Sequence, residues 1–238
     1  MYDFTRQVVM VTGGTGNLGR ATVLAFADAG ARVVIVDRDT ERQKKLYADW
    51  VENDRYLLMA PFDVTSPTDV SRLVAECVDK TGAIDVLVNT VGAYRGGNPI
   101  QQTDPETWDV LMELNARSVF LLARETIPQM LEQGHGKIVN VAARAGQLGT
   151  SGQAAYAASK AAVISLTESM SAELRRKGIN VNCILPGTID TPENRKAMPD
   201  ANAGRWVAPE SLASVILFLA SDAARDVHGA ALPVYGQS

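Results

Sequence analysis

Short apolar runs alternate along the chain with longer segments in which apolar residues recur every three to four positions. The short runs are rich in β-branched residues and apolar on both faces, which is typical of parallel strands buried beneath helices. They predict strands over residues 7–12, 32–36, 56–60, 84–89, 137–141, 179–185 and 230–234. The longer segments predict helices over residues 18–29, 40–52, 67–80, 105–133, 154–177 and 209–221.

Strand–helix alternation predicts an α/β fold, a Rossmann-like doubly wound seven-stranded parallel sheet with helices on both faces. No repeat, low-complexity tract or linker interrupts the alternation, so one domain is expected over residues 1–238. Within the helix predicted over 154–177, an apolar stripe has helical spacing and is expected to face the core or a subunit interface. The stripe consists of Val163, Leu166, Met170 and Leu174.

Charge and composition narrow the class of partner. The net charge of −4 argues against nucleic acid and anionic membranes, which bind basic patches. No apolar run approaches the ~18 residues of a spanning helix, and the N-terminal segment does not resemble a signal peptide. Cys77 and Cys183 lack metal-type spacing, so packed reduced thiols, no metal site and a cytoplasmic location are expected. His135 and His228 lie in loops next to glycine and are expected to be solvated or structural.

A glycine-rich turn follows the first predicted strand and opens a helix. It reads Thr12-Gly13-Gly14-Thr15-Gly16-Asn17-Leu18-Gly19. Glycine permits a tight turn and lets backbone N–H groups approach a pyrophosphate at the positive end of the helix. The pattern therefore predicts a nucleotide cofactor, with four candidate contacts. These are Gly13, Thr15, Asn17 and Leu18.

Asp37 ends the second predicted strand, 18 residues after Gly19. A carboxylate at this place accepts both adenosine ribose hydroxyls and repels a 2′-phosphate, so NAD(H) is favoured. Arg38 follows at once and can pair with such a phosphate, so NADP(H) stays possible. The alternative interpretation of this segment is a solvated turn.

Tyr156 and Lys160 stand four residues apart on one predicted helix and project from the same face. An unperturbed tyrosine, with a pKa of about 10, is a poor acid–base group at neutral pH. A nearby ammonium favours the phenolate and is expected to lower that pKa. Taken alone, the pair is equally compatible with an ordinary helix surface.

Six motifs in order resemble those of the short-chain dehydrogenase/reductase superfamily, and the resemblance covers almost the whole chain. They are the glycine turn, Asp63-Val64, Asn89-Thr90-Val91-Gly92, Asn115, Tyr156-x-x-x-Lys160 and Pro186-Gly187-Thr188-Ile189-Asp190-Thr191. The resemblance implies an NAD(P)-dependent oxidoreductase that acts on a small molecule. Members commonly pair through long helices, so a homodimer or homotetramer is also implied.

The resemblance also implies a role for each motif. Tyr156 would be the general acid/base. Lys160 would bind the nicotinamide ribose and polarise Tyr156. Asn115 would hold a water that relays protons to Lys160. The remaining positions would contact the cofactor. Asp63 and Val64 would hold the adenine, Asn89, Val91 and Gly92 would line the adenosine and ribose site, and Pro186, Gly187, Ile189 and Thr191 would close over the nicotinamide.

Three departures from the family pattern stand out. Asn17 replaces a glycine of the common turn, and asparagine tolerates left-handed backbone geometry better than most residues. The C-terminal Val234-Tyr235-Gly236-Gln237 replaces the usual Asp-Gly-Gly.

The third departure is at the family's catalytic serine, which should stand 13 residues before Tyr156, and that position is Ala143. Removing one donor to a developing oxyanion costs ~10²–10³ in rate, so a carbonyl-reducing enzyme with Ala143 needs another donor. Thr150, Ser151 and Arg144 are nearby in sequence.

A substrate that develops no oxyanion is the other way to accommodate Ala143. One branch of the superfamily, dihydropteridine reductase, is similar here, because it keeps the Tyr/Lys pair and has alanine in place of serine. The segments 92–98 and 190–201 also resemble that branch. Tyr94 would stack on a flat heterocycle, and Met198 would line the same substrate pocket.

Three hypotheses for the function follow. The leading one is an NAD(P)(H)-dependent oxidoreductase of unknown substrate. The second is reduction of a quinonoid or imine heterocycle, although Asn115 and the Asn89 motif follow the carbonyl-reducing majority. The third is a catalytically weak nucleotide-binding sensor or partner subunit.

Overall fold

Seven parallel strands form one sheet in the computed structural model, which describes residues 2–237. The strands are β1 (Val8–Thr12), β2 (Arg32–Val36), β3 (Tyr56–Met59), β4 (Val86–Asn89), β5 (Gly136–Val141), β6 (Ile179–Pro186) and β7 (Ala231–Val234). Their order is β3-β2-β1-β4-β5-β6-β7, the doubly wound arrangement with a switch point between β1 and β4. The predicted fold is confirmed, and each predicted strand is correct to within two residues.

The helices follow the prediction less closely. They are α1 (Asn17–Asp28), α2 (Thr40–Leu46), α3 (Pro67–Thr81), α4 (Pro105–Leu111), α5 (Ser118–Gln133), α6 (Arg144–Gln147), α7 (Ala154–Leu174), α8 (Pro192–Ala197) and α9 (Pro209–Ala220). The helix predicted over 105–133 is divided by a π-helical turn at Met112–Arg117. The helices α6 and α8 were not predicted, because four and six residues are too few to show a helical period.

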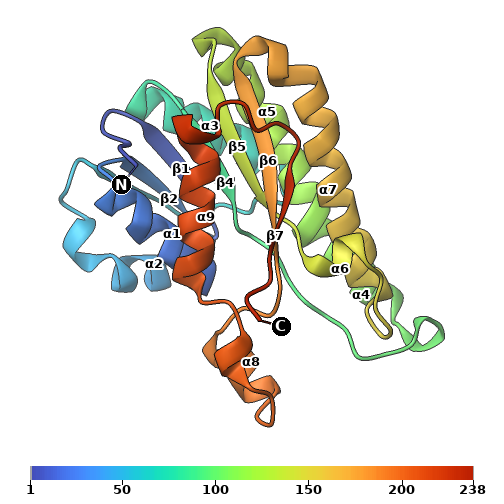
Figure 1. The fold of residues 1–238 in the computed structure, drawn as a ribbon. Coiled ribbons are helices and arrows are strands. Elements are labelled where there is room, and N and C mark those ends of the chain that lie inside the picture. The colour runs from blue at the N-terminus through green and yellow to red at the C-terminus, as the bar shows by residue number, and fades with distance from the viewer. Residues whose placement is uncertain (1, 238) are drawn as a thin grey trace.

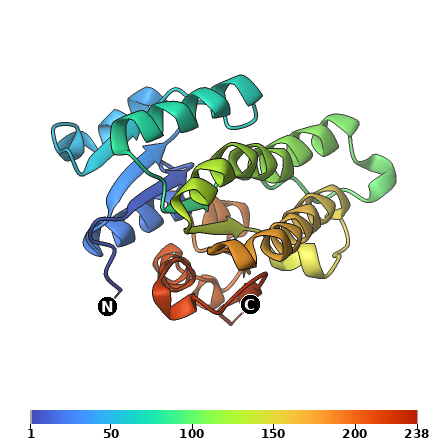
Figure 2. The ribbon, with the colours of Figure 1, turned by 90° about the horizontal axis from the view of Figure 1, so that it is seen from above.

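Helices cover both faces of the sheet. Alternate residues of β1 point to opposite faces, so Val9 and Val11 join one apolar cluster while Val8 and Met10 join the other. Figure 2 shows the sheet between these layers, with α3 and α5 above it and α9 below. None of the helices between residues 2 and 237 combines the length and the apolar character needed to span a bilayer.

The apolar stripe of α7 is divided between core and surface. Val163, Met170 and Leu174 are buried, whereas Leu166 is partly exposed. Cys77 on α3 and Cys183 on β6 are free and buried, as expected of packed thiols.

All seven strands end at the lower edge of the sheet in Figure 1. Beyond this edge lie the glycine turn after β1, the loop after β4, Ala143 after β5, and the segment 187–206 after β6, which includes α8 and is here called the flap. His135 and His228 precede β5 and β7, so both lie at the opposite edge and both are exposed, as expected. His135 is bonded there to Asp85.

Candidate active site

The glycine turn adopts a backbone that only glycine fits at two places. Gly13 has φ +67°, and a Cβ on Gly19 would lie 2.0 Å from the Gly13 carbonyl oxygen. The turn leads directly into α1. The N-cap residue of this helix is Gly16, which has no side chain to accept hydrogen bonds from the backbone N–H groups of the first turn. Such an open helix end binds anions. The turn therefore fits the pyrophosphate of a dinucleotide.

Asp37 lies beside this turn and is bonded to it. Its Oδ2 accepts hydrogen bonds from the Thr15 backbone N–H (3.0 Å) and hydroxyl (2.8 Å). Its Oδ1 accepts from the N–H groups of Arg38 and Asp39. The Asp37-Arg38-Asp39 segment is thus an ordered turn, with the Asp37 carboxylate held beside the glycine turn and Arg38 exposed.

Two residues of the α2 region also hold the turn and were missed by sequence reasoning. The Arg42 guanidinium donates to the Thr15 carbonyl (2.9 Å), and the buried Tyr47 hydroxyl donates to the Gly14 carbonyl (2.6 Å). Burial raises the pKa of Tyr47 far above its ordinary value, so the hydroxyl stays a donor. The available signal was their place in the helix predicted directly after Asp37.

Lys160 is buried on α7, and its Nζ donates to the Val141 carbonyl (2.8 Å) at the end of β5. Burial lowers the pKa of Lys160 to about 8. Gly92 lies directly over it, since a Cβ there would come 3.2 Å from Nζ. The ammonium group is therefore fixed between β4 and β5.

Tyr156 stands one turn before Lys160, with its ring edge-on to Tyr94 at a centroid distance of 4.9 Å. Burial, with a smaller contribution from Tyr94, raises the pKa of Tyr156 to about 12. The expected lowering of this pKa is not seen, because the Lys160 ammonium faces the Val141 carbonyl and desolvation dominates. In this arrangement Tyr156 is a proton donor.

Asn115 occupies the π-helical turn and is fully buried. Its Oδ1 accepts from the Ala93 N–H (2.8 Å), and its Nδ2 donates to the Ala93 carbonyl and to Ser159 Oγ. Ser159 in turn donates to the Tyr156 carbonyl (2.8 Å). A π-helical turn often marks a functional place in a helix. Here it ties the β4 loop to α7, and Ser159, which sequence reasoning missed, completes the link.

Ala143 is buried and forms the uncapped start of α6. The three hydroxyl or guanidinium groups considered as substitutes for serine have the following surroundings. The Arg144 guanidinium stacks over the Tyr235 ring at 5.0 Å, Thr150 donates weakly to the Leu148 carbonyl, and Ser151 is exposed. Tyr235 also donates to Gln147, so the unusual C-terminus packs against α6.

The flap follows β6 beyond the same edge of the sheet (Figure 1). Thr191 caps α8 by accepting from the Asn194 N–H, and Arg195 bonds Asp190 through two nitrogens. Gly187 donates to the Val234 carbonyl, and Ile189 pairs with Val207. Met198 at the end of α8 is 40% exposed, and Tyr94 in the loop after β4 is 59% exposed.

The remaining predicted contacts lie at the same edge of the sheet. The Asp63 carboxylate accepts from Thr65, and Val64 is buried in the apolar core. Asn89 is 2% exposed, and its Nδ2 donates to Asn140 Oδ1 between β4 and β5, whereas its Oδ1 is buried without a hydrogen-bond partner among the described residues. Val91 and Gly92 continue from it beneath the site. Among the described residues, no cluster of His, Cys, Asp or Glu is arranged to hold a metal ion.

Comparison with known proteins decides the family. The family model "short chain dehydrogenase" matches residues 7–202. The chain is a short-chain dehydrogenase. The dehydrogenase is 36% identical to a 3-oxoacyl-(acyl-carrier-protein) reductase of Thermotoga maritima, over 97% of this chain and 96% of the relative. It is 34% identical to the BbsD subunit of a hydroxy(phenyl)methylsuccinyl-CoA dehydrogenase of Thauera aromatica, over 97% and 95%.

The dehydrogenase also matches a solved structure, the crystal structure of gox2181. The TM-score is 0.92 at 32% identity, over 98% of this chain and 96% of that one. Membership of the family makes the dehydrogenase an oxidoreductase that uses a nicotinamide cofactor and acts on a small molecule.

Proposed function

We propose that this dehydrogenase uses NAD(H) and that Tyr156 is its general acid/base. The observation that supports the proposal is the position of Tyr156 and Lys160 on one face of α7, at the edge of the sheet where the glycine turn opens. Because all seven strands belong to one sheet, we also propose one cofactor-binding domain over residues 1–238. Those two end residues lie just outside the described ones.

The glycine turn, Asp37 and the flap would hold the cofactor, which when bound supplies or accepts a hydride. Tyr156 donates the proton to the substrate atom that becomes basic in reduction, and its raised pKa keeps it protonated before the reaction. Lys160, whose ammonium is bonded to the Val141 carbonyl one helical turn from Tyr156, would hold the nicotinamide ribose. Asn115 and Ser159 position both groups by fixing the β4 loop against α7.

The preference for NAD(H) rests on Asp37. Its carboxylate is held beside the turn by Thr15 and would accept ribose hydroxyls but repel a 2′-phosphate. Arg38 follows Asp37 in the chain, and Arg42 is bonded to the Thr15 carbonyl of the glycine turn. Because these two cations could pair with a 2′-phosphate, we also propose that NADP(H) binds at lower affinity.

Steady-state assays over a panel of carbonyl, imine and quinonoid-pterin substrates test this function. We expect turnover with at least one class of substrate. The kcat/KM with NAD(H) should be at least about tenfold above that with NADP(H), because one unfavourable contact between the Asp37 carboxylate and the 2′-phosphate has an effect of this order. No turnover with either nicotinamide cofactor would contradict the proposal.

Two observations favour a second candidate, reduction of a flat quinonoid or imine heterocycle. Ala143 places no hydroxyl at the position where an oxyanion would need one. The Tyr94 ring stands exposed beside Tyr156 and offers a surface on which a heterocycle can stack. With Met198 across the opening, these residues would form the substrate pocket.

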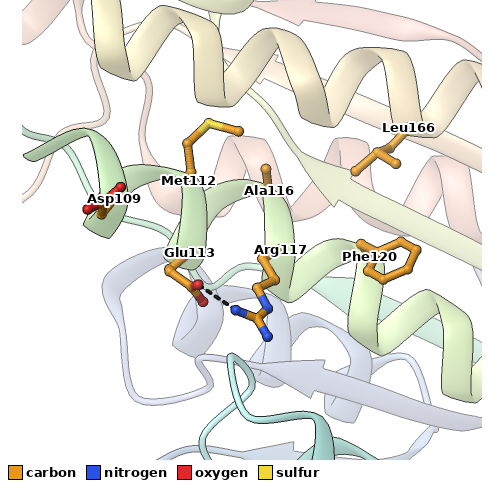
Figure 3. A pocket seen from close by; sticks show the side chains of 7 residues that line it. All are labelled: Asp109, Met112, Glu113, Ala116, Arg117, Phe120 and Leu166. Atoms are coloured by element: carbon orange, nitrogen blue, oxygen red, sulfur yellow. Dashed lines mark hydrogen bonds and ion pairs between the residues drawn. The ribbon is translucent and has the colours of Figure 1, made fainter. Parts of the chain in front are cut away.

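We further propose that the dehydrogenase pairs with a second copy through α5 and α7. A groove of about 570 Å³ is lined by seven residues, most of them from α4 and the π-helical turn, with Phe120 from α5 and Leu166 from α7 (Figure 3). They are Asp109, Met112, Glu113, Ala116, Arg117, Phe120 and Leu166. Phe120 is 48% exposed there, and Glu113 and Arg117 form an ion pair at its rim. An exposed apolar groove with a charged rim is typical of a subunit interface.

Replacement of Phe120 by glutamate should dissociate the oligomer. The change puts a charge into the apolar groove, and burying it unpaired costs several kcal/mol. Sedimentation velocity should show a dimer or tetramer for the wild type and a monomer for Phe120→Glu. Leu131→Glu, at the far end of α5, is the matched control. A variant that sediments like the wild type would exclude this interface.

A further inference from the structure

One hydrogen bond joins the flap to the glycine turn. Asn17 Nδ2 donates to Glu193 Oε2 at 2.9 Å, although the two residues are 176 positions apart. Asn17 is the first residue of α1, and Glu193 lies in the first turn of α8. The side chain that replaces a glycine in the turn is therefore the point at which the flap is attached.

The bond brings a carboxylate to the positive end of α1. None of the residues in the first turn of α1 is acidic, and the N-cap Gly16 has no side chain. An anion at such an end is stabilised by the helix dipole. The Arg42 guanidinium, bonded to the Thr15 carbonyl, adds a positive charge on the same side. Glu193 thus supplies the negative charge that α1 itself lacks.

Glu193 is held in this position by the fold of the flap. Thr191 caps α8, Asn194 Nδ2 donates to the Ile189 carbonyl (2.8 Å), and Asp190 and Arg195 form a two-bond ion pair. Its own backbone N–H and the Asn17 amide, with a smaller contribution from Arg42, hold the pKa of Glu193 below its ordinary value. The group is therefore a carboxylate at neutral pH.

We propose that Glu193 competes with the cofactor pyrophosphate for the N-terminal end of α1 and so sets cofactor affinity. Two anions repel each other at one helix end, so the arrival of a diphosphate breaks the Asn17–Glu193 bond and releases α8 from the turn. Departure of the diphosphate restores the bond. The inference rests on the proposed cofactor role of the glycine turn.

Calorimetric titration of the full chain with adenosine, ADP and NAD⁺ tests the competition. Glu193→Gln keeps the size of the side chain and removes its charge. It should tighten binding of ADP and NAD⁺ about two- to fivefold, the effect of an exposed charge at a helix end, and leave binding of adenosine unchanged. The gain should shrink as salt screens the charges. The control Glu52→Gln, an exposed glutamate before β3, should change none of the three.

Hydrogen exchange of the flap gives a second measurement that needs no turnover. Glu193→Ala in the free protein and ADP in the wild type should each speed exchange of the backbone amides of residues 193–198. If the wild type binds ADP but Glu193→Gln binds it no more tightly, the competition is wrong and the cofactor site stands. If neither ADP nor NAD⁺ binds the wild type, the proposed cofactor site is wrong, and the proposed competition is wrong as well.

Discussion

Tyr156→Phe should lower kcat by ~10²–10⁴-fold while leaving the affinity for the nicotinamide cofactor unchanged. General acid–base catalysis contributes a factor of this size, and phenylalanine keeps the ring contact with Tyr94 while removing the only atom that can donate a proton. Pre-steady-state and steady-state rates, together with cofactor titration, measure the two effects separately. Tyr56→Phe, which removes a phenolic hydroxyl at the start of β3, is the matched control.

The same variant separates an enzyme from a binding protein. A nucleotide sensor or partner subunit that lacks turnover should respond to the cofactor equally well with tyrosine or phenylalanine at position 156. Equal kcat in Tyr156→Phe and the wild type would therefore assign the acid/base role to another residue.

Ala143→Ser should raise kcat/KM for the native substrate by ~10²–10³ if that substrate is a carbonyl or alcohol. The added hydroxyl would stand 13 residues before Tyr156 and donate to the oxygen on which charge develops, which is the size of effect expected of one oxyanion donor. For an imine or quinonoid substrate the product proton goes to nitrogen, so the added hydroxyl should be neutral or harmful. Progress curves over the same substrate panel distinguish the two outcomes.

Ala145→Ser is the control for this variant. It makes the same chemical change two residues further on, within α6, and should alter no rate. A large gain with a pterin and none with any carbonyl would contradict the mechanism proposed for Ala143. The two candidate substrate classes thus respond in opposite ways to one added oxygen.

Much of the fold follows from local pattern alone. The strands were predictable because each is a short β-branched run bounded by polar residues, a signal that needs no distant contact. Residue type and spacing also suffice to name candidate groups of the site, such as the glycine turn and Tyr156 with Lys160, and their roles stay predictions. The π-helical turn around Asn115 was not, because its register depends on the buried bonds to Ala93 and Ser159.

By itself, the sequence determined the α/β class, the order of strands and helices, the family, and the absence of a serine at position 143. Those properties depend on periodicity and on residue identity at fixed spacing. Only the tertiary structure decided which groups meet. In the folded chain the Lys160 ammonium is bonded to the Val141 carbonyl and does not lower the pKa of Tyr156. The Arg144 guanidinium stacks on the Tyr235 ring. The tertiary structure also brought Glu193 to Asn17 across 176 residues. No local pattern encodes such contacts, because desolvation and pairing are set by the packing of segments that are far apart in the chain.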